Sequence, residues 1–176
     1  FLVVGTAAVY QQLQYMKNAR LGFTKDQKVV IEFPGEAITG ANYQTIKRAF
    51  LRCPDVAGAT FSSSVPGRWN YLWRMAPPGE SETNSQAVNC YGVNSDFFTE
   101  YGLELTAGRE FRLPSGTDDA TGGWVINHAA MRAFGWQSTE EALTGAIGSS
   151  ESPVIGVAKD FHFRGLQGSI DPMALY

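Results

Sequence analysis

The sequence predicts a mixed fold of strands and helices, and three observations lead to this class. Lys28–Phe33, Asn42–Cys53 and Val56–Ser64 have the patterns of a strand, a helix and a strand within about forty residues, which suggests a βαβ unit or half of a split one. Arg68–Met75 alternates aromatic side chains with others, as a strand with two different faces does. From Gln86 onward, further strands alternate with short helices.

Length and composition indicate a globular chain of one domain or two small lobes. The chain has 176 residues, of which 44% are hydrophobic and 18% charged. Its net charge of −3 gives no basic field to hold nucleic acid or an anionic membrane surface. The two cysteines, Cys53 and Cys90, do not make a disulfide framework. We expect two small buried side chains, with a single disulfide as the alternative.

The first residues form a nearly continuous apolar run that leads into a helix. The chain begins with Phe1 rather than Met, so we expect a piece of a longer chain. Residues 1–10 are too few to cross a hydrocarbon layer of about 30 Å. They suit a core element or the last turns of a membrane-spanning helix. Good helix formers continue to Ala19 and Gly22 supplies a stop, so we predict one helix over residues 3–19.

The helix of the βαβ unit has an apolar face and two end signals. Tyr43, Ile46, Phe50 and Cys53 recur at intervals of three and four residues. Asn42 is the predicted N-cap, and the residue after Cys53 is a proline, which ends the helix.

Three aromatic side chains are the candidate contact surface. Trp69, Tyr71 and Trp73 fall on one side of the predicted strand Arg68–Met75. Such a row covers the core of a sheet or forms a platform for a sugar, an apolar ligand or a partner. The polar loops Pro77–Ser85 and Pro114–Gly123 are the most accessible further candidates.

The stretch Val88–Asn127 and the residues after it have the signals of structural joints. Asn94 or Ser95 is the predicted cap of a short helix, which Gly102 ends. Asn127 caps the next helix, and Ser138 with Glu141 forms a capping box. The predicted strands are Gln86–Val93, Leu103–Leu105, Trp124–Ile126, Val154–Ala158 and Met173–Tyr176.

Chemical motifs are weak throughout. Asp160 and His162 would point to the same side of a strand, but no nucleophile has a suitable context, so we assign them to turn hydrogen bonds. His128 and His162 are the only histidines, and they form no metal-binding pattern. Phosphate-binding glycine motifs do not occur. We therefore predict no catalytic, cofactor-binding or metal-binding residue, and no enzyme activity.

Four runs together carry a family resemblance. They are QQLQYMKNARLGFTKDQKVVI after the apolar start, YGVNSDFFTEYGLELTAGREF, WVIN, and PVIGVAKDFHFRGLQGSIDPMALY. The chain resembles, over essentially its whole length, the periplasmic core domain of MacB/FtsX-like ABC transporter permeases, in particular those of Bacteroidetes.

The resemblance implies a function and a location. It implies an extracytoplasmic domain, anchored in the inner membrane, that couples ATP hydrolysis by a separate subunit to periplasmic motion, which is called mechanotransmission. The implied partners are that ABC ATPase, a second permease copy, and a periplasmic or outer-membrane protein. A ligand-binding or sensor module that uses Trp69, Tyr71 and Trp73 is the alternative. No cofactor and no nucleic acid are expected.

The resemblance also implies an α+β fold in two lobes. Residues 1–23 would be the end of the first transmembrane helix and its extension, 24–64 the first part of a porter-like βαβ lobe, and 65–170 an inserted mixed α/β lobe. Residues 171–176 would begin a return strand to the porter-like lobe, whose second half is then missing. We therefore expect Ile46 and Phe50 to be less covered than a core helix demands.

Overall fold

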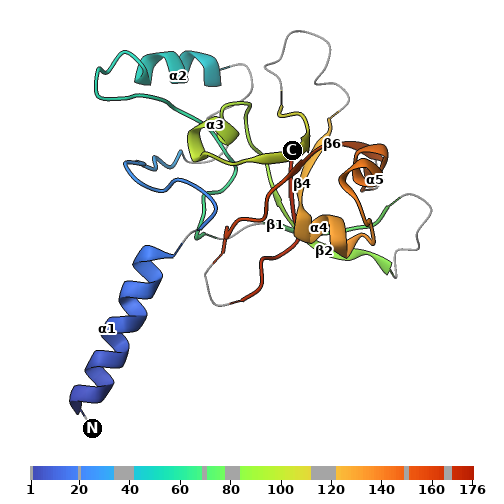
Figure 1. Cartoon of the computed structure of the whole chain (residues 1–176). Coiled ribbons are helices and arrows are strands. Elements are labelled where there is room, and N and C mark those ends of the chain that lie inside the picture. Colours follow the sequence, from blue (N-terminus) through green and yellow to red (C-terminus); the bar gives the residue numbers. More distant parts are fainter. Residues whose placement is uncertain are drawn as a thin grey trace.

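The body of the protein is built on one mixed sheet, and the N-terminal helix projects away from it (Figure 1). The computed structural model describes residues 2–19, 21–33, 42–68, 71–77, 84–111, 122–148, 151–164 and 168–176. The helices are α1 (Leu2–Asn18), α2 (Tyr43–Phe50), α3 (Phe97–Tyr101), α4 (His128–Ala133) and α5 (Thr139–Thr144). The strands are β1 (Tyr71–Met75), β2 (Gln86–Tyr91), β3 (Leu105–Gly108), β4 (Trp124–Asn127), β5 (Ala146–Ile147), β6 (Ser152–Ala158) and β7 (Met173–Leu175).

The sheet has the strand order β1-β2-β7-β4-β6-β3, with β5 paired to β6 outside this path. The pairs β2–β7 and β4–β6 are parallel, whereas β1–β2, β7–β4 and β6–β3 are antiparallel. Helices and a mixed sheet in one body confirm the predicted α+β class.

Two apolar clusters lie against the sheet, and strand alternation assigns them to opposite faces. Along β4, Trp124 and Ile126 belong to the cluster that includes residues of α4 and α5, whereas Val125 belongs to the cluster that includes α3. Val125 and Ile126 are completely buried. The sheet is therefore covered on both faces, which explains why Val154–Ala158 reads as a nearly continuous apolar run.

Strand β7 has a central place in the sheet. The expectation that residues 171–176 begin a return strand to a porter-like lobe stays a prediction; in this structure Met173–Leu175 lies between β2 and β4 in the middle of the sheet. All three residues are buried. A short apolar run at the end of a sequence fits an edge or a central position equally well, because only its pairing partners decide between them.

Two predicted strands are wrong. Lys28–Phe33 is irregular, and Val56–Ser64 contains only one isolated bridge, between Ser62 and Val93. Both segments have strand-like composition, but a strand is stabilised by its neighbour. Among the described residues Lys28–Phe33 has no neighbouring strand, and Val56–Ser64 meets only the short stretch after β2, at residues 61–63. The βαβ unit is therefore not formed here, and the division into two lobes stays a prediction.

Helix α2 is less covered than a core helix, as predicted. Tyr43 is its one buried residue, and both Ile46 and Phe50 are only half-buried. Asn42 precedes the helix but its side chain makes no capping hydrogen bond, so the predicted cap is wrong. Its backbone has helical φ and ψ values, which hold the side chain away from the position that a cap needs.

The caps of the sheet-bound helices follow the sequence more closely. The Asn127 side chain accepts a hydrogen bond from the Ala130 amide, and the Ser138 side chain accepts one from the Glu141 amide. Helix α3 differs, because its N-cap position is Asp96 and that side chain makes no capping bond. Its C-cap, Gly102, has the expected left-handed conformation with φ 61°.

The two cysteines differ in exposure. Cys90 is buried as expected, but Cys53 is exposed, and both thiols are free. Position 53 lies beyond the last turn of α2, where no element covers it. Trp69 and the greater part of both polar candidate loops, residues 78–83 and 114–121, lie outside the described residues.

Candidate coupling joint

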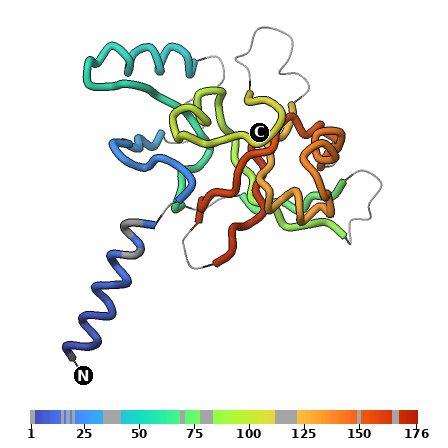
Figure 2. The backbone as a smooth tube through the Cα atoms, viewed as in Figure 1, coloured from blue at the N-terminus to red at the C-terminus, as the bar shows by residue number. Residues whose placement is uncertain are grey.

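Helix α1 is connected to the body through a short segment with defined hydrogen bonds. Figure 2 follows the chain from α1 into the body. The carbonyl oxygen of Leu21 accepts a hydrogen bond of 2.8 Å from the amide of His162, and the Thr24 amide donates one of 2.7 Å to the carbonyl oxygen of Tyr101. Residues 21–24 are therefore held by two parts of the body that are far apart in the sequence. We call this segment the joint.

Gly22 allows the joint to approach the body closely. Its φ of +81° lies in the left-handed region that side chains disfavour. A Cβ atom at this position would lie 2.9 Å from the Phe161 Cβ and 3.1 Å from the carbonyl oxygen of Asp160. The glycine that the sequence marks as a helix stop is also a contact with the run Asp160–His162.

The next residue of the joint reaches the apolar cluster beneath α3. Phe23 packs against this cluster, with its ring 6.0 Å from that of Tyr101 in an edge-on arrangement. Phe161 and Phe163 belong to the same cluster and are almost fully buried. An edge-on aromatic contact of this kind stabilises the packing of the joint against the body.

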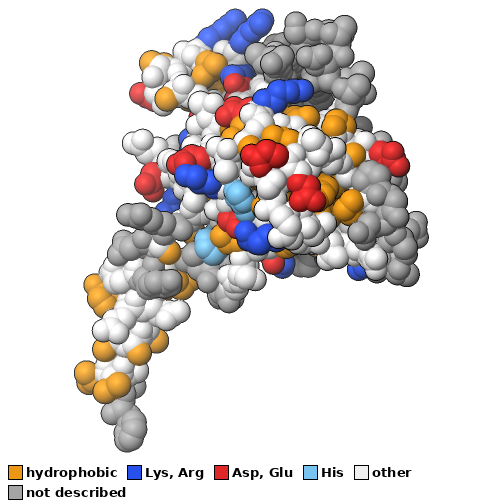
Figure 3. Space-filling view, turned by 45° about the vertical axis from the view of Figure 1, so that its right-hand side comes forward, with side chains coloured by type: hydrophobic (Ala, Val, Ile, Leu, Met, Phe, Trp, Pro, Cys, Tyr) orange, Lys and Arg blue, Asp and Glu red, His pale blue; other side chains and the backbone are white. Residues whose placement is uncertain are grey.

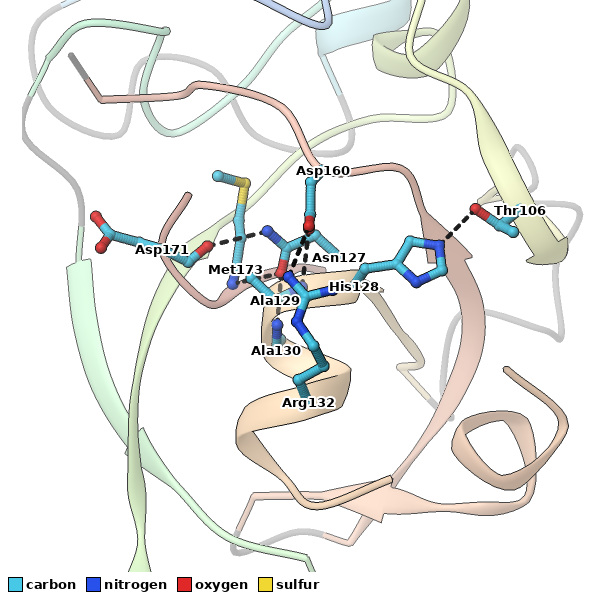
Figure 4. A network of polar contacts seen from close by, with 9 residues as sticks. All are labelled: Thr106, Asn127, His128, Ala129, Ala130, Arg132, Asp160, Asp171 and Met173. Carbon is cyan, nitrogen blue, oxygen red and sulfur yellow. Dashed lines mark hydrogen bonds and ion pairs between the residues drawn. The ribbon is translucent and has the colours of Figure 1, made fainter. Parts of the chain in front are cut away.

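Asp160 connects the joint to helix α4 (Figure 4). One carboxylate oxygen accepts a hydrogen bond of 2.8 Å from the Ala129 amide, and the other accepts one of 2.8 Å from Arg132. The carboxylate thus binds the first turn of α4, where the helix dipole favours a negative charge. Asp160 is occupied by a structural role, in agreement with the assignment made from its sequence context.

The two histidines make different contacts, one through its ring and the other through its backbone. The ring of His128 makes a hydrogen bond of 2.9 Å with the Thr106 hydroxyl on β3. His162 contributes its backbone amide to the joint. Among the described residues, no group of three or more His, Cys, Asp or Glu side chains is placed to hold a metal ion.

Asn127 stands next to Asp160 and ties three segments together (Figure 4). Its side-chain oxygen accepts hydrogen bonds from the amides of Ala130, at 2.8 Å, and Met173, at 3.0 Å. Its side-chain nitrogen donates one of 2.9 Å to the carbonyl oxygen of Asp171. With 1% of its surface exposed, Asn127 holds the start of α4 to the start of β7 in the interior of the body.

Two of the three aromatic residues of the candidate contact surface lie among the described residues, and both are exposed. Tyr71 and Trp73 lie on the edge strand β1 with 61% and 41% of their surfaces exposed. The Trp73 ring stacks on Tyr176, 5.6 Å away, and meets the buried Trp124 edge-on at 6.0 Å. Sequence reasoning did not include Tyr176 in this group, although alternation along β7 places it on the same face as Ala174. A contact role for these rings stays a prediction.

A wide hollow lies beside the joint, between the predicted strands that are not formed. Its volume is about 2060 Å³, and its walls include Val29, Ile31, Phe50, Phe61 and Tyr176. Tyr71 and Trp73 do not line it. The ligand-binding alternative requires a concavity that holds at least two of the predicted aromatic rings, and this hollow does not supply one.

The two thiols are expected to differ sharply in reactivity. Burial raises the pKa of Cys90 to about 12, so its nucleophilic thiolate is scarce at neutral pH, whereas Cys53 is exposed. At pH 8, a disulfide reagent should titrate one thiol per folded chain and the second only after unfolding in urea. The variant Cys53→Ser should show no reactive thiol before unfolding. Fast reaction of two thiols in the folded wild type would contradict this.

The raised pKa of Cys90 also affects the stability of the folded chain at high pH. Because the pKa of Cys90 is higher in the folded chain than its ordinary value of 9.0, the contribution of this thiol to stability is complete below pH 9.0. It is lost as the pH rises towards 12, since the unfolded chain ionises first. Burial also raises the pKa values of Tyr101 and Tyr176, which adds to the loss.

Comparison with known proteins gives matches among solved structures alone. Neither protein-family models nor curated proteins match the chain. A domain of a permease protein from Porphyromonas gingivalis aligns with 74% of this chain at 19% identity and a TM-score of 0.47. The periplasmic region of MacB from Actinobacillus actinomycetemcomitans aligns with 74% at 18% identity and a TM-score of 0.43.

A third structure is the extracellular domain of the noncanonical ABC-type transporter YknZ from Gram-positive bacteria. It aligns with 64% of this chain at 18% identity and a TM-score of 0.39. The chain spans about half the length of each of the three structures, with 54%, 55% and 53% covered. The activities, substrates and partners of those proteins are not transferred by likenesses this distant.

Proposed function

We propose that this chain is a non-enzymatic, extracytoplasmic domain of an ABC transporter permease, in which α1 is the stalk that leads to the membrane. The observation that carries the proposal concerns α1. This helix has exposed apolar side chains, and it is held to the body by residues 21–24, which belong to the first of the sequence runs that carry the family resemblance. Val3, Val4 and Val9 have 80%, 73% and 60% of their surfaces exposed. Figure 3 shows apolar side chains along the visible face of this helix.

Helix α1 is shorter than the hydrocarbon layer of a membrane. Its 17 residues extend for about 25 Å, less than a hydrocarbon layer of about 30 Å. No described helix combines the length and the apolar character that crossing a membrane requires. In the proposal, α1 is the outer part of a membrane anchor, with the body in the periplasm.

The proposed mechanism is mechanical. ATP hydrolysis by a separate subunit moves the membrane anchor, and α1 carries the movement to residues 21–24. The joint transmits this movement through Gly22 and Phe23 to the apolar cluster that contains Phe161. It also transmits the movement through Asp160 to α4. No described residue has to act as an acid, a base or a nucleophile. The partners of the proposal are an ABC ATPase, a second permease copy and a protein of the periplasm or outer membrane.

The location can be tested with a native thiol. Cys53 is exposed and Cys90 is buried. In a full-length protein whose cysteines outside these 176 residues are replaced by serine, a membrane-impermeant maleimide should therefore label spheroplasts at Cys53 alone. Cys53→Ser, which leaves the buried thiol, is the matched control and should remain unlabelled. Labelling of the wild type that requires lysis of the spheroplasts would place the body in the cytoplasm and overturn the proposal.

The coupling can be tested by a distance. A spin label on Cys53 of the full-length permease, reconstituted with its ATPase in nanodiscs, should report a different separation between copies with and without ATP. Gly22→Ala should reduce this change, because its Cβ meets Phe161. Gly67→Ala is the matched control, since Gly67 has φ +88° but nothing within 4 Å. Identical separations in wild-type protein that hydrolyses ATP would refute mechanical coupling.

A further inference from the structure

Helix α3 contacts the first part of the chain at both of its ends. At its C-terminal end, the carbonyl oxygen of Tyr101 accepts the hydrogen bond of 2.7 Å from the Thr24 amide of the joint. Just before its N-terminal end, the side-chain oxygen of Asn94 accepts a hydrogen bond of 2.5 Å from the Thr60 hydroxyl. The two phenylalanines of α3 are almost fully buried against the sheet, so this helix of five residues is itself fixed to the body.

Two carboxylates at α3 form ion pairs with lysines of the same first part of the chain. Asp96 pairs with Lys47 on α2 at 2.6 Å, and Glu100 pairs with Lys28 at 3.6 Å. Asp96 and Glu100 are four residues apart and lie on one face of the helix. The four side chains keep between 19% and 30% of their surfaces exposed, so salt reaches both pairs and weakens them.

Gly58 allows one of these carboxylates to lie against a third segment. A Cβ atom at this position would overlap the carboxylate of Glu100. Glu100 therefore contacts Lys28 through its charge and the segment Val56–Ser64 through close packing at Gly58. The carboxylates of α3 thus contact three segments that are distant from one another in the sequence.

We propose that these ion pairs are a conformational device, a latch in which Asp96 and Glu100 hold α2 and the segments around residues 28 and 58 to the body. The latch opens when α3 shifts or when salt screens the charges. Because Thr24 binds the other end of α3, movement of the joint reaches the latch. Only this last step rests on the proposed function, since the latch is formed by contacts within the chain.

Helix α2 is the element whose folding reports the state of the latch. It has eight residues, and a helix of this length is not stable alone in water. Its one buried side chain, Tyr43, packs edge-on against Phe61 at a ring distance of 5.7 Å. The ion pair between Lys47 and Asp96 is a second contact between α2 and the rest of the chain. Opening of the latch should therefore make the backbone amides of α2 exchange faster with solvent.

Hydrogen exchange of the 176-residue chain, followed by mass spectrometry, tests the latch as a double-mutant cycle. Lys47→Gln and Asp96→Asn should each speed exchange in α2 by about threefold, the effect of one partly exposed ion pair. The double variant should exchange no faster than either single variant, because both remove the same contact. Raising the salt concentration from about 0.1 M to about 1 M shortens the screening length from about 10 Å to about 3 Å. It should speed exchange in the wild type more than in the double variant.

Arg48→Gln is the matched control. Arg48 is the neighbour of Lys47 on α2, but it is exposed and forms no ion pair with a described residue, so its replacement should leave the exchange of α2 unchanged. Unchanged exchange in β4 and β6 shows that the body of each variant is folded.

Equal effects of Lys47→Gln and Arg48→Gln, additive effects in the double variant, or an equal response of wild type and double variant to salt would overturn the proposal. The experiment uses neither a membrane nor an ATPase, so its failure leaves the transporter assignment standing. Conversely, labelling that places the body in the cytoplasm would overturn that assignment and leave the latch in place.

Discussion

Replacing Asn127 with alanine is expected to lower the free energy of unfolding by about 3 kcal/mol. The change removes the N-cap of α4, which costs about 1 kcal/mol, and leaves the buried Met173 amide without its acceptor, which costs about 2 kcal/mol more. It also removes the donor to the Asp171 carbonyl. Urea unfolding followed by circular dichroism, with the midpoint and slope fitted together, measures the loss.

Ser138→Ala is the matched control for this loss. Ser138 caps the neighbouring helix α5 through one hydrogen bond of 3.2 Å to the Glu141 amide, and it ties no second segment. Its removal should cost about 1 kcal/mol, the ordinary value for an exposed cap. If both variants lost the same amount, the contact between Asn127 and β7 would contribute nothing measurable.

Replacing Gly108 with alanine should be at least as destabilising, by about 3 kcal/mol. Gly108 has φ +79°, and a Cβ there would overlap the carbonyl oxygen of Ile155 and lie 2.7 Å from the Gly156 Cα. The neighbours are backbone atoms of β6, so they cannot rotate away as a side chain would. Strand β3 must shift, and the hydrogen bond from Arg109 to Ile155, now 2.9 Å, weakens. Thermal and urea unfolding both report the change.

Gly135→Ala separates the clash from the backbone conformation. Gly135 has φ +81°, almost the value of Gly108, but nothing lies within 4 Å of the position that its Cβ atom would take. Its replacement should cost about 1–2 kcal/mol, the strain of a left-handed side-chain residue alone. An equal loss in both variants would show that the close approach of β3 to β6 is not tight.

The parts of the fold that the sequence predicted are those fixed by nearby residues. Asn127, Ser138 and Gly102 act within one turn of their own position, so a local pattern is enough to find them. Strand β6 was equally visible, because burial on both faces leaves a continuous apolar run.

The parts that were missed depend on distant partners. Lys28–Phe33 has the composition of a strand, but no neighbour among the described residues completes it. The central place of β7 follows from pairing with β2 and β4, which a single sequence does not reveal.

The joint was missed for a related reason. In the sequence, Gly22 signals the end of a helix, and His162 suggests chemistry of its ring. In the structure, Gly22 allows a close approach of two backbone segments, and His162 donates its backbone amide to the joint. Backbone contacts between remote segments leave little trace in residue type. The positive φ of Gly22 is compatible with a stop signal as much as with a joint.

The position of β7 has a consequence for the order of folding during synthesis. Among the described strands, β1 and β2 on one side meet β4, β6 and β3 on the other only through Met173–Leu175. While a ribosome still holds those residues, the two halves share no strand pairing and the edges of β2 and β4 stay open. The two halves of the sheet therefore join only after β7 has emerged, and a nascent chain needs protection at two open edges until then.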